Sequence, residues 1–161
     1  MKFLIVLALI GAAAAYTPLS SDQYSLVKST WDQVSHNEVD ILYAIFKAYP
    51  DIQAKFPQFN GKDLDSVKGT PDFALHATRI VSFIGELVTL TSSEANAPAV
   101  QSTVEAFAVR HHNRGVTKDQ FNEFRTAFFS YISSHSTWGD NAAAAWNQAI
   151  DNIYGIAFTK L

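Results

Sequence analysis

The sequence predicts an all-α protein with a single domain of six to eight helices. Apolar residues recur at intervals of three and four along most of the chain, which places them on one face of each helix. Strand-like alternation of useful length does not occur. At 161 residues, of which 48% are hydrophobic, the chain is long enough to bury one core. No repeat or linker divides it, so these helices should form one compact unit.

The first fifteen residues differ from the rest. A short basic start precedes a continuous apolar stretch over residues 3–10, and Ala13-Ala14-Ala15 follows. This order is typical of a secretory signal peptide, whose cleavage site has the pattern A-x-A. The apolar stretch is too short to span a bilayer. We expect a signal peptide over residues 1–15 and an exported domain over residues 16–161; the alternative is an apolar N-terminal helix of the fold.

Capping residues and prolines set the expected bounds in the first half of the chain. Ser20 and Gln23 form a capping box that opens a helix. Pro50 interrupts the next apolar run, because the residue before a proline avoids the helical conformation. Asn60-Gly61 is a turn signal. The expected segments are a helix after Ser20, a helix over residues 37–49, a short helix over 51–56, and one or two loose turns over 62–67.

Four longer helices are expected in the second half. Thr70-Pro71 is a strong helix start, with threonine at the N-cap and proline in the first turn. Thr117 and Gln120 form a second capping box, and Gly115 ends the helix before it. The expected helices run from Pro71 to about Leu90, from Pro98 to about His112, from Lys118 to about His135, and from after Gly139 to about Lys160.

Charge and composition exclude several classes of protein. The net charge is −3 and no run of Lys or Arg occurs, so the basic surface required for nucleic-acid binding is missing. The lack of cysteine excludes disulfide scaffolds, thiol catalysis, zinc–thiolate sites and iron–sulfur clusters. Aromatic residues make up 13% of the chain and include 12 Phe. A large flat apolar ligand would give these rings a packing partner, although a Phe-rich core accounts for them equally well.

Two of the five histidines lie on apolar helix faces. His111 continues the stripe formed by Val104 and Phe107, whereas His112 lies one step around the helix and faces water or the rim. Burying an imidazole without a partner is costly, and a metal ion is one good partner. The phase of the helix therefore marks His111, rather than His112, as a candidate metal ligand.

His76 lies on the apolar face of another helix, between Phe73 and Ile80. Two inward histidines on different helices predict a shared cavity. A zinc site would require a third protein ligand, and no carboxylate is placed for it. Phe56 and Phe59 follow the proline-bent short helix, and an aromatic pair in a loop indicates an apolar surface that it covers.

These features together resemble the globin family and, within it, the secreted haemolymph globins of the midge-larva type. The resemblance extends from Leu19 to Trp146 and includes the expected signal peptide. The segments that carry it are Ala54–Phe59, Gly61–Leu64, His76–Val81 and Arg114–Val116.

The resemblance implies a globin fold around a pocket for haem b (iron protoporphyrin IX). His111 corresponds to the proximal histidine, which ligates the haem iron, and a hydrogen-bond acceptor should hold its other ring nitrogen. His76 corresponds to the distal histidine, which acts on the iron through bound oxygen rather than as a ligand at rest. Both the helix phase and the Arg114–Val116 segment favour His111 over His112.

The resemblance also implies the remaining haem contacts. Phe56 packs on the ring at the corner with Phe59 nearby, and Ile80 crowds the bound ligand. Arg79 reaches the haem propionates or the mouth of the pocket. The other residues assigned to the pocket wall are Phe73, Phe107, Val116 and Phe121.

The implied function is reversible binding of molecular oxygen, for transport or storage, by a secreted, extracellular haemolymph protein that is not an enzyme. No nucleic-acid or membrane partner is expected, and the protein should be a monomer or a homodimer. One alternative is a haem enzyme, a nitric-oxide dioxygenase or a peroxidase, on the same fold. Turnover would then require a reductase partner, because the chain carries no flavin or nicotinamide domain. Another alternative is an iron-free carrier of some other apolar ligand.

Overall fold

The computed structural model describes residues 16–161, so the expected signal peptide, residues 1–15, lies outside the described residues. The described part of the chain contains eight α-helices and one short 3₁₀ helix, and no strand. The prediction of an all-α fold is confirmed. The helices are α1 (Ser21–Val34), α2 (Glu38–Ala48), α3 (Pro50–Gln53), α4 (Leu64–Lys68), α5 (Pro71–Leu90), η1 (Glu94–Asn96), α6 (Ala97–His112), α7 (Lys118–His135) and α8 (Asp140–Ala157).

The predicted caps are present. Both capping boxes form, with the Ser20 and Thr117 side chains accepting from the backbone N–H of Gln23 and Gln120, respectively. The Thr70 hydroxyl accepts from the backbone N–H of Phe73 at the start of α5. These side chains satisfy N–H groups that a helix leaves without partners in its first turn, and each helix therefore begins where the sequence indicates.

The short helix α3 ends at Gln53, earlier than the expected Phe56. The Gln53 side chain is buried and donates to two backbone carbonyls of the following corner, those of Phe59 at 2.9 Å and Lys62 at 3.0 Å. These two bonds fold the corner back on α3 in place of a further helical turn. The last helix, α8, likewise ends at Ala157 instead of continuing to Lys160.

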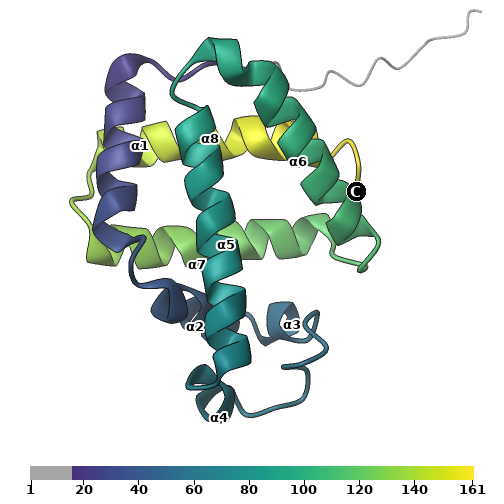
Figure 1. The fold of residues 1–161 in the computed structure, drawn as a ribbon. Coiled ribbons are helices and arrows are strands. Elements are labelled where there is room, and N and C mark those ends of the chain that lie inside the picture. The colour runs from purple at the N-terminus through teal and green to yellow at the C-terminus, as the bar shows by residue number, and fades with distance from the viewer. Residues whose placement is uncertain (1–15) are drawn as a thin grey trace, which may run out of the picture.

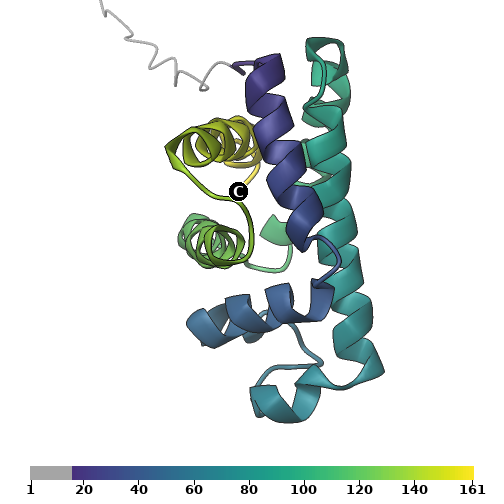
Figure 2. The same cartoon turned by 90° about the vertical axis from the view of Figure 1, so that its left-hand side faces the viewer.

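The helices form two crossing layers. Helices α1 and α5 run roughly alongside each other, and α7 and α8 cross behind them at a steep angle (Figure 1). Turned by 90°, the same structure shows α7 and α8 nearly end-on beside the upright α1 and α5 (Figure 2). Helix α2 packs on both α5 and α7, while α6 packs on α8. Helices α5 and α6 also contact each other and are joined through η1.

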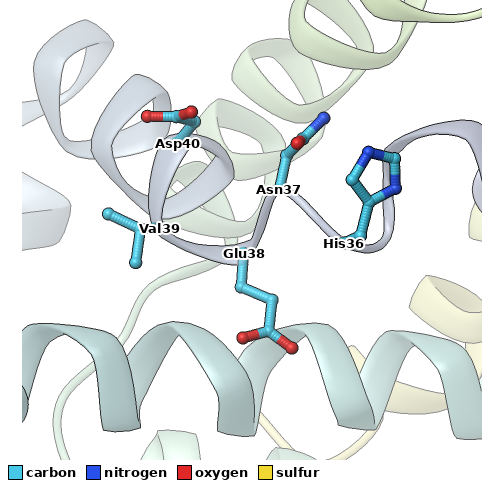
Figure 3. Close-up of a pocket in the computed structure, with 5 residues that line it drawn as sticks. All are labelled: His36, Asn37, Glu38, Val39 and Asp40. Carbon is cyan, nitrogen blue, oxygen red and sulfur yellow. The ribbon is translucent and has the colours of Figure 1, made fainter.

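The turn between α1 and α2 forms an open polar depression lined by His36, Asn37, Glu38, Val39 and Asp40 (Figure 3). The Glu38 carboxylate extends from it toward the neighbouring helix, where the Thr78 hydroxyl donates to it at 2.7 Å. This bond joins the start of α2 to α5. The residues of the depression include none of those that the sequence assigns to a ligand pocket.

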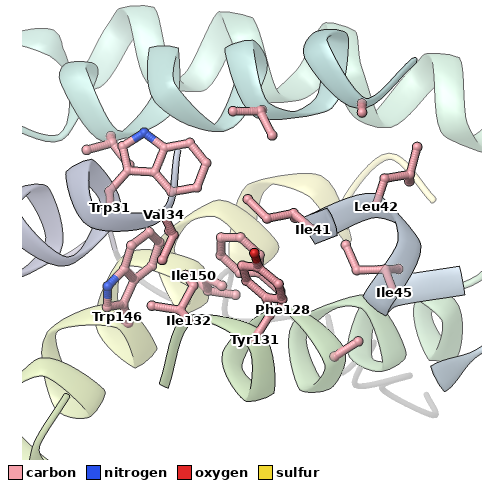
Figure 4. Close-up of a cluster of buried hydrophobic side chains, with 14 of the residues drawn as sticks. Trp31, Val34, Ile41, Leu42, Ile45, Phe128, Tyr131, Ile132, Trp146 and Ile150 are labelled. Atoms are coloured by element: carbon pink, nitrogen blue, oxygen red, sulfur yellow. The ribbon is translucent and has the colours of Figure 1, made fainter. Parts of the chain in front are cut away.

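The core lies between the two layers and is rich in aromatic rings (Figure 4). Trp31 of α1 contacts Phe128 of α7 and Trp146 of α8, with ring centroids 6.1 and 6.5 Å apart. The Trp146 indole N–H donates to the hydroxyl of Thr30 at 2.8 Å, and both residues are buried. Burial in this cluster supplies the main driving force for folding, and the indole bond fixes how α1 and α8 sit together.

We expect Thr30→Val to lower the free energy of unfolding by about 1–3 kcal/mol, because it leaves the buried Trp146 N–H without an acceptor. The matched control is Thr126→Val, since Thr126 is an exposed α7 residue whose hydroxyl bonds only within its own helix. Urea unfolding measures both changes. Equal effects of the two substitutions would contradict the role assigned to the buried bond.

The Tyr154 phenol gives a second prediction, for alkaline pH. Its hydroxyl donates to the Phe121 carbonyl between α8 and α7, and burial raises the pKa of Tyr154 above its ordinary value of 10.0. The unfolded chain therefore loses this proton first as the pH rises, so the stabilisation is complete below pH 10.0 and declines above it.

Tyr154→Phe should therefore be less stable than the wild type at neutral pH, by about 1 kcal/mol. The difference should shrink as the pH rises above 10.0, where ionisation in the unfolded chain penalises only the wild type. Urea unfolding of both proteins at neutral and alkaline pH measures this. A difference that is constant over the whole range would be inconsistent with a phenol that stays protonated in the fold.

Candidate functional site

His111 lies in the last turn of α6 and its ring is half-buried. Its Nδ1 is 2.8 Å from the Phe107 carbonyl oxygen one turn earlier. Since a carbonyl only accepts, Nδ1 carries the proton and the lone pair lies on Nε2. The sequence-based expectation that an acceptor holds this ring nitrogen is confirmed.

The surroundings of His111 favour its neutral form. Burial lowers the pKa of His111, the Arg114 and Arg110 guanidinium groups lower it further, and the Phe107 carbonyl opposes them. The ring packs against Phe107 and Phe121, with centroids 3.9 and 5.7 Å away. A neutral imidazole with a lone pair on Nε2, set among aromatic rings, is the donor that an axial site on haem iron requires. The residues present therefore fit the implied cofactor.

His112 is exposed, as the phase of the helix predicts. The chain turns immediately after it: the backbone N–H of Gly115 donates to the His112 carbonyl and that of Val116 to the His111 carbonyl. Gly115 has a φ of +69°, a conformation that favours glycine. This turn ends α6 with His111 directed toward the interior side of the helix.

His76 lies on α5, half-buried, beside the corner between α3 and α4. Its ring meets Phe56 and Phe59 edge-on, with centroids 4.8 and 5.7 Å away. The Gln58 side-chain amide contacts Nδ1 of His76 at 3.0 Å. Burial lowers the pKa of His76, and Arg79 and Arg114 lower it further, while Asp72 opposes them. The corner that the sequence marked by its two phenylalanines therefore holds this histidine directly.

The two histidines are electrostatically linked through one arginine. The positive charge of Arg114 lowers the pKa of both His76 and His111. Arg79, which the resemblance assigns to the pocket mouth, is exposed and affects His76. Both predicted histidines therefore have positive charge in their surroundings.

Apolar side chains of α5 and α6 are only partly covered. Ile80, Phe107 and Val116 from the predicted set are half-buried and pack against the main core. Phe121 is buried and contacts both Phe107 and His111. Apolar side chains from several elements therefore remain partly exposed. A flat apolar ligand would cover a surface of this kind.

Phe73 has a different place from the other predicted wall residues. It is fully buried, and its ring packs on Phe46 and Phe59, with centroids 5.9 and 5.4 Å away. Phe59 in turn stands between Phe73 and the His76 ring. Phe73 therefore supports the corner from behind, because the aromatic cluster of α2, the corner and α5 closes over it.

Two residues near the predicted site, Phe83 and Lys55, were not assigned to it from the sequence. Phe83 stacks on Phe107, with centroids 4.6 Å apart and planes at 15°. The Lys55 ammonium donates to the Gly115 carbonyl at 2.7 Å and so ties the corner to the turn after α6. The helical periodicity of the sequence indicates the apolar position of Phe83. No local pattern indicates the bond between Lys55 and Gly115, because these residues lie far apart in the chain.

Helix α5 is apolar and long enough to suit a membrane span by length and composition, and it is the one such helix within residues 16–161. In the fold it packs on α1, α2 and α6, with Phe73, Ala77, Val81 and Val88 buried. Of its half-buried residues, Phe83 stacks on Phe107 and His76 contacts Phe56 and Phe59, all of them residues of the candidate site or its surroundings. Within the same part of the chain, no group of three or more His, Asp or Glu side chains is arranged to hold a metal ion.

Comparisons with known proteins agree with this arrangement. A family model described as Globin matches residues 39–157. Globin CTT-V of Chironomus thummi piger is 61% identical over 158 residues, which cover 98% of this chain and 97% of that protein. Globin CTT-VIIB-7 of the same organism is 58% identical over 161 residues, covering 100% and 99%. A haemoglobin component (TA-VII) from Tokunagayusurika akamusi superposes with a TM-score of 0.88 at 42% identity, covering 91% and 99%. The chain belongs to the globin family.

Proposed function

We propose that this protein is an extracellular haem protein that binds oxygen reversibly and transports or stores it. The observation that carries the proposal is the His111 ring, whose Nδ1 is committed to the Phe107 carbonyl and whose Nε2 is left as a lone-pair donor among aromatic side chains. The similarity to a solved haemoglobin component over 91% of the chain supports it. The cofactor proposed is haem b, and its ferrous iron would supply the reversible oxygen-binding chemistry.

His111 would hold the cofactor by ligating its iron through Nε2. The Phe107 carbonyl fixes the tautomer and the orientation of the ring, as carbonyls that accept from metal-bound histidines commonly do. The Gly115 turn and the Lys55 tether hold the end of α6 against the corner. Contacts on both sides of the end of α6 thus orient the His111 ring.

His76 would act as a hydrogen-bond donor to a bound ligand that carries partial negative charge. Such a bond is worth about 1 kcal/mol, or about fivefold in affinity. Phe56, Ile80 and Phe107 would exclude water, which strengthens the hydrogen bond and protects a ferrous centre from oxidation. His76 is thereby assigned to tuning the ligand, while His111 anchors the cofactor.

The exposed arginines would bind the carboxylates of the cofactor. The positive charges of Arg79 and Arg114 lower the pKa of His76, and that of Arg114 also lowers the pKa of His111. Guanidinium groups bind carboxylates through paired, charge-assisted hydrogen bonds. We assign the haem propionates to these two arginines, with Arg79 as predicted from the sequence and Arg114 added from the structure.

The absorption spectrum of the purified protein tests the function. We expect a strong Soret band that shifts reversibly when the solution is cycled between oxygen and nitrogen. A protein that remains colourless after haem is added would contradict haem binding. A band that does not respond reversibly to oxygen would contradict the carrier function while leaving haem binding intact.

The ligand assignment is tested by comparing His111→Ala with His112→Ala. His111→Ala should accelerate haem loss by more than about 100-fold, because removing a metal ligand has a larger effect than removing the group that hydrogen-bonds to that ligand. His112→Ala should leave haem loss near the wild-type rate, since His112 is exposed. Transfer of haem to an excess of apomyoglobin measures the rates. The reverse order would show that His112 is the ligand.

We also propose that residues 1–15 are a signal peptide removed on secretion. The relative globin CTT-VIIB-7 aligns over the full length of the chain, including this segment. After cleavage the domain would begin at Tyr16, and Thr17 is already fixed to α8 by reciprocal hydrogen bonds with Asn152 at 2.9 and 2.7 Å. Cleavage before Tyr16 would leave intact the segment that Thr17 attaches to α8.

Secretion from insect cells tests this processing. The mass of the secreted protein should correspond to residues 16–161. Ala15→Glu should block cleavage, because the residue before the cut must be small, whereas Ala14→Glu should be processed normally, since the middle position of A-x-A is permissive. A secreted protein that retains residues 1–15, or equal effects of the two substitutions, would contradict the assigned cleavage site.

A further inference from the structure

We propose that Gln58 is a positioning residue for His76: its amide fixes the ring in the tautomer that carries the proton on Nε2 and holds it in place to donate into the site. This inference rests on the function proposed above, since it concerns how His76 acts on a bound ligand. It adds a second residue to that role, located in the corner between α3 and α4.

The contact itself defines the tautomer. The amide nitrogen Nε2 of Gln58 lies 3.0 Å from Nδ1 of His76. An amide nitrogen only donates hydrogen bonds, so Nδ1 must accept and cannot carry a proton. In a neutral ring the remaining proton is then on Nε2. The opposite tautomer would present a lone pair from Nε2, which would repel the partial negative charge that His76 is proposed to stabilise.

The packing around His76 restricts its movement. Phe56 and Phe59 meet the ring edge-on at 82° and 86°, and Gln58 lies between these two residues in the chain. The same short corner therefore supplies all three contacts. An outward swing of the ring must break the Gln58 bond and leave both aromatic edges.

The corner is rigid enough for this role. The buried Gln53 side chain donates to the carbonyls of Phe59 and Lys62, and the Lys55 ammonium donates to the Gly115 carbonyl. Phe59 is 1% exposed and packs on Phe46 and Phe73. Gln58 thus projects from a backbone that is fixed on both sides, and its amide can hold a defined position.

The kinetic test uses the haem-loaded protein and two gases. Gln58→Met keeps the length of the side chain and removes its donor, so the oxygen dissociation rate should rise about fivefold. The carbon monoxide rate should change by less than about twofold, because that ligand gains little from a hydrogen bond. Gln58→Lys, which restores a donor, should return the oxygen rate toward the wild-type value.

A double-mutant cycle with His76 separates this inference from the proposed function. His76→Leu alone should raise the oxygen dissociation rate, and adding Gln58→Met to it should have no further effect, because the two residues act through one bond. If His76→Leu raises the rate and Gln58→Met does not, the positioning role is overturned while the proposed function stands. If His76→Leu has no effect, the role of His76 and this inference both fail.

A spectroscopic readout tests the tautomer independently of ligand kinetics. The ring ¹⁵N chemical shifts of His76, measured in the diamagnetic carbon monoxide form, should show a protonated Nε2 and a bare Nδ1 in the wild type. Gln58→Met should shift them toward a mixture of tautomers. A protonated Nδ1 in the wild type would overturn the proposal, as would equal acceleration of both gases by Gln58→Met, which would indicate a loosened corner instead.

Discussion

The hydrogen bond between Nδ1 of His111 and the Phe107 carbonyl is the constraint on which the site depends. It is local, spanning one turn of α6, and it requires α6 to stay helical to its end, while the rotation of the helix about its axis decides which way the ring faces. That rotation is set elsewhere: Val100, Val104 and Ala108 are fully buried against residues of α8. The packing of α6 against α8 therefore contributes to the core of the domain and also sets the direction of the His111 ring.

The apolar surface around the site follows from how the two layers meet. Helix α5 uses one part of its apolar face for the core and leaves Ile80 and Phe83 partly uncovered. Exposed apolar surface of this kind costs free energy in water, and a flat apolar cofactor would recover it. The stability of the fold and the binding of the cofactor are thus expected to be linked, because a ligand that binds only the folded state stabilises it.

Much of the fold could be predicted because its signals are local. Periodicity and caps located the helices, and the phase of α6 separated His111 from His112. How deeply a side chain is buried was less predictable. The spacing that placed Phe73 on the inward face of its helix did not show that Phe46 and Phe59 would enclose its ring. The contact of Gln58 with His76 depends on how the corner folds over α5, which no run of neighbouring residues encodes. Loop contacts of this kind require the tertiary structure.

The most direct test of the account is the location of the iron. Crystals of the purified, haem-loaded protein, measured above and below the iron absorption edge, give an anomalous difference map in which only iron contributes strongly. The account predicts a single peak within bonding distance of Nε2 of His111, on the side of the site opposite His76. A peak beside His112, a peak bonded to His76 with none near His111, or no peak at all would contradict it.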